Sequence, residues 1–318
     1  MDQTDSVSVS ADDLKNSSIR DDYKDYCIEQ GTEIVTYPLY RAFQVLWIIV
    51  AVTSLPYVIR VYWMYIKGSK LHRNIKILLL VLHSSFITVN LTFAICQSYQ
   101  LLLSITFAHP CDVFISVLFY SCMNITYGFS LELALLTDAS MAVERVIATI
   151  LAKSYEHTKP YPAILGIVIS IVVSAAVEFY LYYGGTFLQP RISFLSSPTP
   201  RNTKIDAVLI FNTLCSIATT SVMIVLIIMN KKRESRTIGV VAWHFQTVEN
   251  IETTGMIAKL SFIQLLAFVA QSFGTLLIRF LDLHLDVSMF QHVPLMKATK
   301  LGVQVRILSI GSSDFIDF

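Results

Sequence analysis

An acidic and a basic residue, Glu144 and Arg145, stand side by side in an otherwise apolar part of the chain. A stretch of nineteen residues without a charge, residues 113–131, precedes them. An arginine at the end of a membrane helix can pair with carboxylates in one state and become free when helices separate. Asp138, seven residues before Arg145, lies on nearly the same helical face and is a second candidate partner. These residues predict a conformational switch, with an ordinary ion pair at the membrane interface as the alternative.

The composition places this pair in a membrane protein. The chain has 318 residues and a mean hydropathy of +0.59. Only 15% of its residues are charged and 54% are apolar, whereas about 25% are charged in soluble domains. We therefore expect an all-α, polytopic transmembrane helical bundle. A net charge of +1 gives no support for nucleic-acid binding.

Six mainly apolar segments are long enough to cross a bilayer, whose core of about 30 Å requires about 20 helical residues. They are expected at residues 42–66, 77–103, 113–141, 162–183, 206–229 and 257–279, within a bundle that covers 42–281. An acidic tail, 1–41, precedes them and lacks the pattern of a cleavable signal peptide. In the segment after them, 282–318, the longest uncharged stretch has ten residues, so a seventh span is doubtful.

Basic residues are concentrated in alternate loops. The loops after the first, third and fifth spans contain Lys67, Lys70, Arg73, Lys76, Arg145, Lys153, Lys159, Lys231, Lys232, Arg233 and Arg236. The positive-inside rule predicts that these loops are cytoplasmic and that the N-terminus is extracellular in the plasma membrane. Asn16, in the triplet Asn-Ser-Ser, is then a candidate glycosylation site.

Two of the five cysteines, Cys27 and Cys111, lie outside the predicted spans. Both are extracellular in the predicted topology, where the environment is oxidising and a disulfide between them can form. The alternative is two free or separately paired thiols.

Motifs for an enzyme or a metal site are missing from the sequence. It contains no HExxH, GxSxG or GxxxxGK[ST] pattern, and its seven histidines have no metal-ligand spacing. We therefore expect no catalytic residue, metal or cofactor. A six-helix transporter or channel is the alternative from another functional class, although inverted repeats and rings of charge are not evident.

Three short motifs lie in the predicted cytoplasmic loops. They are His72-Arg-Asn74-Ile-Lys76, then Glu144-Arg145-Val-Ile-Ala-Thr followed by Tyr155-Glu156, and Trp243-His-Phe245-Gln246-Thr-Val-Glu249-Asn250. Together they resemble the nematode serpentine chemoreceptors of the Sra superfamily, most closely class alpha/beta, from about Arg41 to Phe280.

This resemblance implies a heptahelical G-protein-coupled receptor in the sensory cilia of chemosensory neurons. Arg145 would be its switch, with Glu144 or Asp138 as the acidic partner. The basic residues after span five, Lys231, Lys232, Arg233 and Arg236, would contact a heterotrimeric G protein or anionic membrane lipid. The ligand would be a small molecule or peptide bound in the outer half of the bundle, between spans three, five and six. The missing seventh span departs from the family and leaves a truncated, non-signalling isoform as an alternative.

Two acidic residues within the spans are further candidates, because ionisable groups in membranes are functional by default. Counted from Val113, Glu132 is about 28 Å along its helix and is expected near the inner interface, in a structural or conformational role. Glu178, beside three tyrosines, is expected to be a solvated interfacial acid or a ligand contact.

Overall fold

The computed structural model describes residues 27–67, 71–151, 155, 160–183, 202–234 and 241–284. Six of the residues that the sequence singles out lie outside these ranges: Asn16, Lys70, Lys153, Glu156, Lys159 and Arg236. So do residues 285–318, where a seventh span was doubtful. For Phe245, Gln246 and Glu249 the structure describes the helix but not the side chains.

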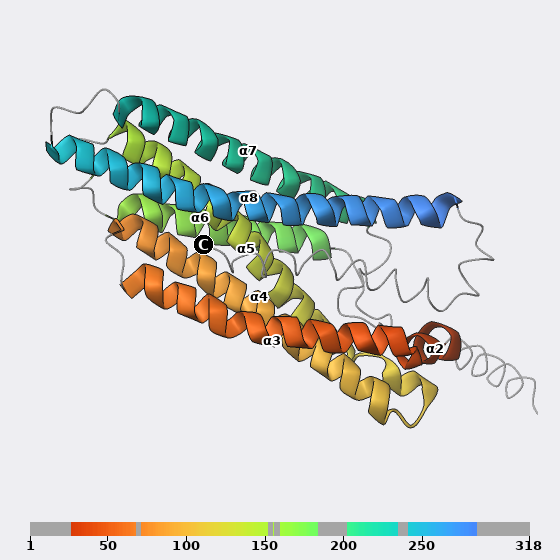
Figure 1. Cartoon of the computed structure of the whole chain (residues 1–318). Coiled ribbons are helices and arrows are strands. Elements are labelled where there is room, and N and C mark those ends of the chain that lie inside the picture. The colour runs from red at the N-terminus through yellow and green to blue at the C-terminus, as the bar shows by residue number, and fades with distance from the viewer. Residues whose placement is uncertain are drawn as a thin grey trace, which may run out of the picture.

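Six long helices form the described bundle (Figure 1). They are α3 (Pro38–Lys67), α4 (Arg73–Thr106), α5 (Val117–Ile150), α6 (Tyr161–Tyr182), α7 (Asn202–Glu234) and α8 (Val241–His284). The predicted all-α transmembrane bundle is confirmed. The helices continue beyond the apolar runs by several residues, because polar residues outside the bilayer core can keep helical hydrogen bonds as well as apolar ones do.

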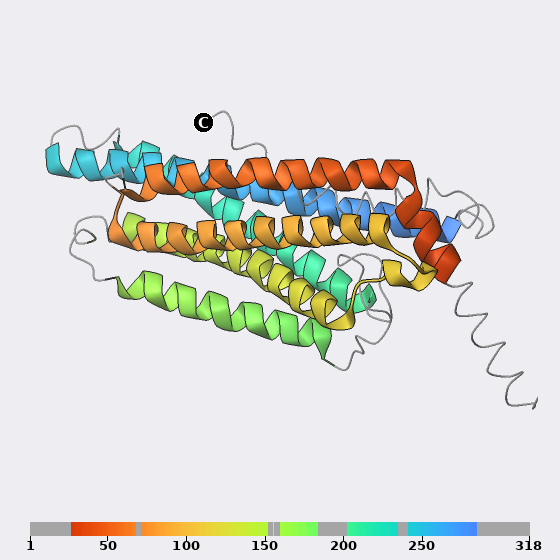
Figure 2. The same cartoon turned by 90° about the horizontal axis from the view of Figure 1, so that it is seen from below.

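The central helix is α5. It packs against α4, α6, α7 and α8, whereas α3 packs mainly against α4. Figure 2 shows α3, α4, α5 and α6 following one another across the bundle. The most exposed side chains of α6 are large and apolar, as expected of a helix that faces lipid.

Five of the described helices are long and apolar enough to cross a membrane, over Pro38–Met64, Arg73–Thr106, Tyr161–Tyr182, Lys204–Glu234 and Asn250–Ala270. The protein is therefore a multi-pass membrane protein. α5 does not meet the same measure of length and composition, because it contains several polar residues that are buried between its neighbours, among them Glu132, Asp138 and Glu144. A helix in the middle of a bundle is shielded from lipid and tolerates such residues.

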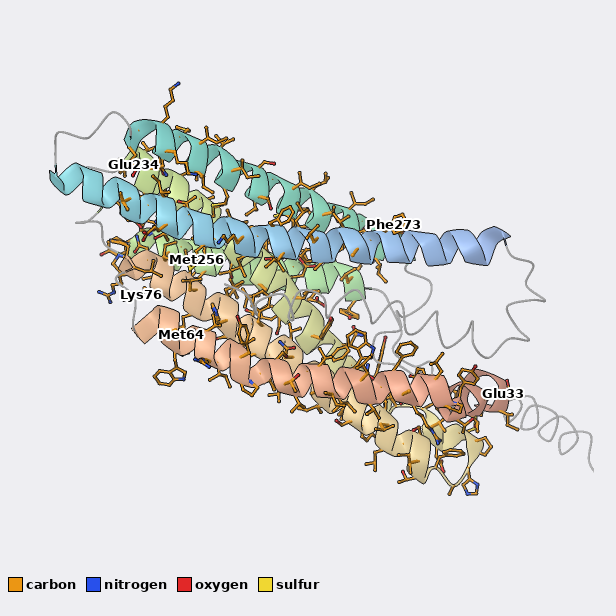
Figure 3. All side chains as sticks on the ribbon, viewed as in Figure 1. Glu33, Met64, Lys76, Glu234, Met256 and Phe273 are labelled. Atoms are coloured by element: carbon orange, nitrogen blue, oxygen red, sulfur yellow. A yellow bond between two sulfur atoms is a disulfide. The ribbon has the colours of Figure 1, made fainter. Side chains whose placement is uncertain are left out.

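The two ends of the bundle differ in chemistry. At one end α4 begins and α5 and α7 terminate, and this basic end carries Arg73, Lys76, Arg145, Lys231, Lys232 and Arg233. Figure 3 shows Lys76 and Glu234 at the basic end and Glu33 at the opposite end. We call the opposite end the disulfide end, because Cys27 Sγ and Cys111 Sγ are bonded there.

Short helices cover the disulfide end. η1 (Ile28–Thr32) and α2 (Glu33–Thr36) pack beside the one-turn helix η2 (Pro110–Val113). Arg41 fixes this arrangement, since its guanidinium donates to Val35 O at 3.0 Å and to Ser104 O at 2.5 Å. Part of the predicted N-terminal tail is thus folded, and α3 begins four residues before the predicted span, with a proline in its first turn.

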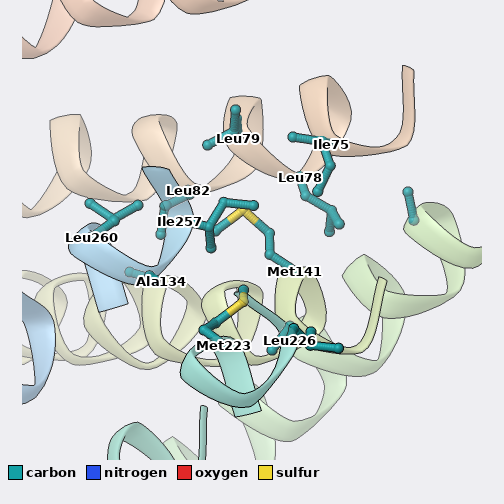
Figure 4. Close-up of a cluster of buried hydrophobic side chains, with 13 residues drawn as sticks. Ile75, Leu78, Leu79, Leu82, Ala134, Met141, Met223, Leu226, Ile257 and Leu260 are labelled. Carbon is teal, nitrogen blue, oxygen red and sulfur yellow. The ribbon is translucent and has the colours of Figure 1, made fainter. Parts of the chain in front are cut away.

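The largest described hydrophobic cluster lies towards the basic end and is shared by five helices (Figure 4). Met141 of α5 is fully buried there among Leu78 and Leu82 of α4, Met223 of α7 and Ile257 of α8. Methionine is flexible and fills irregular gaps between helices. This cluster packs the helices together next to the polar residues of the basic end.

Candidate functional site at the basic end of the bundle

Arg145 and Glu144 form a buried ion pair near the end of α5. Arg145 Nε lies 2.7 Å from Glu144 Oε2, and the two side chains are only 3% and 2% exposed. Glu144 Oε1 has no hydrogen-bond partner among the described residues. A buried ion pair adds little net stability, but removing one partner leaves an uncompensated charge. The pair is therefore sensitive to any movement that separates its members.

Two further groups hold the same guanidinium. Arg145 Nη1 donates to Asn250 Oδ1 of α8 at 3.3 Å, and Nη2 donates to the Tyr155 hydroxyl at 3.3 Å. The Arg145 guanidinium carbon also lies 5.7 Å from the centre of the Tyr155 ring, within the range of a cation–π contact. Arg145 thus links α5 to α8 and to the segment after α5.

Tyr155 extends the cluster to the start of α4. Asn74 Nδ2 donates to the Tyr155 hydroxyl at 3.4 Å. The centre of the His72 ring lies 4.3 Å from the centre of the Tyr155 ring. His72 also begins α4, because its Nδ1 accepts a hydrogen bond from the Asn74 backbone N–H. The structure thus brings together residues of all three sequence motifs: His72, Asn74, Glu144, Arg145, Tyr155 and Asn250.

The end of α7 is attached to α5 one turn beyond Arg145. Asn230 Nδ2 donates to Thr149 Oγ1 at 3.2 Å, and Arg233 Nη1 donates to the Thr149 carbonyl at 2.7 Å. Of the basic residues that the sequence placed after span five, Arg233 is thus packed on α5, whereas Lys231 and Lys232 are exposed. These two exposed lysines lie at the surface of the basic end.

Asp138, the second candidate partner of Arg145, is engaged elsewhere. Ser261 Oγ of α8 donates to Asp138 Oδ1 at 2.8 Å, and both residues are fully buried. The seven residues between Asp138 and Arg145 span about 10 Å of helix, which explains why the carboxylate meets α8 before it can reach the guanidinium. In the structure Glu144 is the acidic partner of Arg145.

Sequence reasoning missed three contacts of α5: Thr149 with Asn230, Asp138 with Ser261, and Glu132 with Asn212. A sequence shows that a polar residue interrupts an apolar helix, but it does not show which residue of another helix forms a hydrogen bond with it. The usable signal was that Asn212 interrupts an apolar run, where an amide needs a partner.

Within the described part of the chain, no group of three or more His, Cys, Asp or Glu residues could hold a metal ion. The contacts observed around Arg145 are hydrogen bonds, an ion pair and a cation–π contact. The buried guanidinium of Arg145 has partners on α5, on α8 and at Tyr155, so a displacement of α8 or of Tyr155 changes its environment.

A bundle of apolar helices that holds a buried arginine with several partners suits a helical membrane receptor. Residues 27–294 match the profile of the family described as "Serpentine type 7TM GPCR receptor class ab chemoreceptor", and the chain belongs to this family. The resemblance found from the three loop motifs is confirmed.

Individual relatives agree with this assignment. The chain is 27% identical to "Serpentine receptor class beta-16" of Caenorhabditis elegans over 76% of its own length and 70% of the relative's. It is 24% identical to "Serpentine receptor class beta-17" of the same species over 73% and 65% of the two lengths. Similarity extends to "Serpentine receptor class alpha-10" of Caenorhabditis briggsae, at 25% identity over 70% and 67%.

Proposed function

We propose that this protein is a chemosensory receptor of the plasma membrane that signals through a heterotrimeric G protein. Its basic end faces the cytoplasm and its disulfide end faces the outside, as basic loops favour. One observation carries the proposal: residues of two motifs bind the buried guanidinium of Arg145, and residues of the third motif contact its partner Tyr155.

The mechanism follows from how Arg145 is held. Its partners lie on α5, on α8 and at Tyr155, so moving α8 away breaks the bond to Asn250. A ligand shifts this equilibrium only by binding the open state more tightly than the closed one. The open state would release the guanidinium towards the cytoplasm, where a G protein can bind it.

Exposed basic residues provide the rest of the docking surface. Lys231 and Lys232 lie in the last turn of α7, next to the Arg145 cluster, and are exposed. They suit an acidic partner surface, or anionic lipid, which attracts each basic residue with about 1 kcal/mol. Under this proposal α7 positions them and Arg233 anchors α7 to α5.

The experiment that tests the proposal compares Arg145→Ala with Arg73→Ala in cells that express the receptor and report second messengers. Arg73 is an exposed arginine at the same end, and so controls for the loss of one basic charge. We expect Arg145→Ala to abolish the G-protein-dependent signal while surface expression persists, and Arg73→Ala to retain the signal.

Two results would contradict the proposal. Transport of a solute without any G protein, unaffected by Arg145→Ala, would identify a transporter or channel. A surface-expressed chain that activates no G protein would identify a non-signalling receptor isoform. The orientation is tested separately with an epitope tag at the N-terminus, which we expect antibodies to reach on intact cells.

A further inference from the structure

A buried acidic residue lies in the middle of the central helix. Glu132 is the sixteenth of the 34 residues of α5 and is only 4% exposed. This position differs from the expected one near the inner interface, because α5 begins at Val117 and continues to Ile150. Asn212 Nδ2 of α7 donates to Glu132 Oε1 at 2.5 Å, and Glu132 Oε2 has no partner among the described residues.

A second carboxylate approaches from α6. The buried face of this helix consists of small residues followed by an acid, namely Ala163, Ser170, Ser174 and Glu178. Glu178 lies against Gly128 of α5, where an added Cβ would overlap its Oε1 and lie 3.2 Å from its Oε2. Gly128 precedes Glu132 by one helical turn, so the two carboxylates occupy adjacent levels of one face of α5.

The atoms left without partners at this point are acceptors. Glu132 Oε2, Glu178 Oε2 and Asn212 Oδ1 are buried and receive no hydrogen bond from any described residue. Asn212 is only 2% exposed, and its amide nitrogen is already used by Glu132. Buried acceptors without donors are costly and rare, so this set calls for a group that brings donors or positive charge.

The described protein supplies no such charge. Neither Glu132 nor Glu178 forms an ion pair with a basic side chain in the described ranges. The nearest lysine along α7, Lys204, instead donates to the carbonyls of Tyr180 and Tyr183 at the disulfide end. Arg145 follows Glu132 by thirteen residues, or about 20 Å of helix.

We propose that Glu132, Glu178 and Asn212 form a binding site for a small monovalent cation, either Na⁺ or the ammonium head of an organic amine. Both offer one positive charge to several oxygens, and an ammonium group has three N–H donors for the three free acceptors. The site lies between α5, α6 and α7, towards the outer half of the proposed receptor. It therefore deepens the proposed function by naming a ligand class, and its effect on signalling rests on that function.

The test measures thermal unfolding of the purified full chain in nanodiscs of uncharged lipid. The probes are sodium chloride and ethylammonium chloride, each titrated against choline chloride at constant ionic strength, since choline is bulky and has no N–H donor. We expect at least one probe to raise the Tm of the wild-type protein saturably. Glu132→Gln and Glu178→Gln should weaken this response more than about tenfold in apparent affinity. Glu252→Gln, which neutralises an exposed acid on α8, should leave it unchanged.

The outcomes separate the two sources of positive charge. Saturation by sodium alone identifies an ion site, and saturation by ethylammonium alone identifies an amine site. Saturation by both identifies one site shared by the two cations. No saturable response in the wild-type protein, or one equal in both glutamine variants, would overturn the proposal and leave protons to neutralise the acids. Since no G protein takes part, this test and the Arg145 test can fail independently.

Discussion

Arg145 on α5 and Asn250 on α8 are 105 residues apart in the sequence, and their side chains meet at 3.3 Å. Among the described side chains, no other polar contact joins Arg145 to α8, and Asn250 stands where α8 enters the bundle at its basic end. A hydrogen bond to a charged group contributes about 1.5–3 kcal/mol, enough to bias an equilibrium between two helix arrangements. Together with the Asp138–Ser261 contact, the bond therefore influences how readily α8 leaves α5.

Asn250→Ala should raise ligand-independent signalling. Loss of about 1.5–3 kcal/mol from the closed state would increase the open population about 10–150-fold while it remains the minor state. Basal second-messenger output, normalised to surface expression, measures this. Glu252→Ala, two residues further along α8 and exposed, is the matched control and should leave the output at the wild-type level. Equal output from both variants would contradict the role of Asn250.

Two substitutions separate the contribution of the Tyr155 hydroxyl from that of its ring. Tyr155→Phe keeps the ring against His72 and Arg145 but removes the hydroxyl that bonds Arg145 and Asn74, at a cost of about 1 kcal/mol. Tyr155→Ala also removes the ring contacts and should cost more. We expect basal signalling and thermal sensitivity to rise in the order wild type, Phe, Ala, as measured by reporter output and unfolding in nanodiscs. A phenylalanine variant as impaired as the alanine variant would assign the whole effect to the hydroxyl.

Gly128→Ala should destabilise the bundle, because its new methyl group would overlap the Glu178 carboxylate. Overpacking of this kind costs about 1–3 kcal/mol, which thermal unfolding would detect. The same change in a Glu178→Ala background should cost much less, since the overlapping atoms are gone.

Gly255→Ala is the control for the helical propensity of alanine. Apart from the neighbouring backbone of α8 itself, no heavy atom lies within 4 Å of the position that its Cβ would take. Alanine is favoured over glycine in a helix by about 1 kcal/mol, so this variant should be as stable as the wild type or more stable. If both glycine variants behaved alike, the close approach of α5 and α6 would not explain Gly128.

The disulfide should contribute strongly to stability, because Cys27 and Cys111 are separated by 84 residues. Closing a loop of this length restricts the unfolded chain by about 4–5 kcal/mol in the chain-entropy treatment. Cys27→Ser, Cys111→Ser and the double variant should lower the Tm equally, since each removes the same bond. Cys122→Ser changes an exposed free cysteine and should have little effect. A double variant much less stable than either single one would argue against a single shared bond.

Much of this architecture could be predicted from sequence because lipid imposes simple rules. Long apolar runs predict the helices, and the motifs around His72, Arg145 and Asn250 indicate the family. These rules depend on composition and local order alone. Even so, α5 was predicted to end near residue 141, whereas its helix continues to Ile150. Charged residues such as Glu144 suggest an exit from the membrane, but here the bundle buries them.

Partner choice could not be predicted in the same way. The sequence offered two carboxylates for Arg145, and only the register between α5 and α8 directs Asp138 to Ser261 and leaves Glu144 for the arginine. Glu132 likewise meets Asn212 through the packing of α5 on α7. Such pairings depend on the rotation of each helix about its axis, which a hydropathy pattern does not specify in a helix that is buried on most sides.

The bond between Cys27 and Cys111 makes the backbone of residues 27–111 a closed covalent ring, and α3 and α4 lie entirely within it. Two helices in one ring cannot drift apart in the bilayer even when their side chains lose contact. α7 and α8 pack on each other outside the ring and have no such bond in the described structure. The order of disassembly is therefore set by covalent topology: heat or detergent should detach the α7–α8 pair first and leave the ringed helices associated to the last.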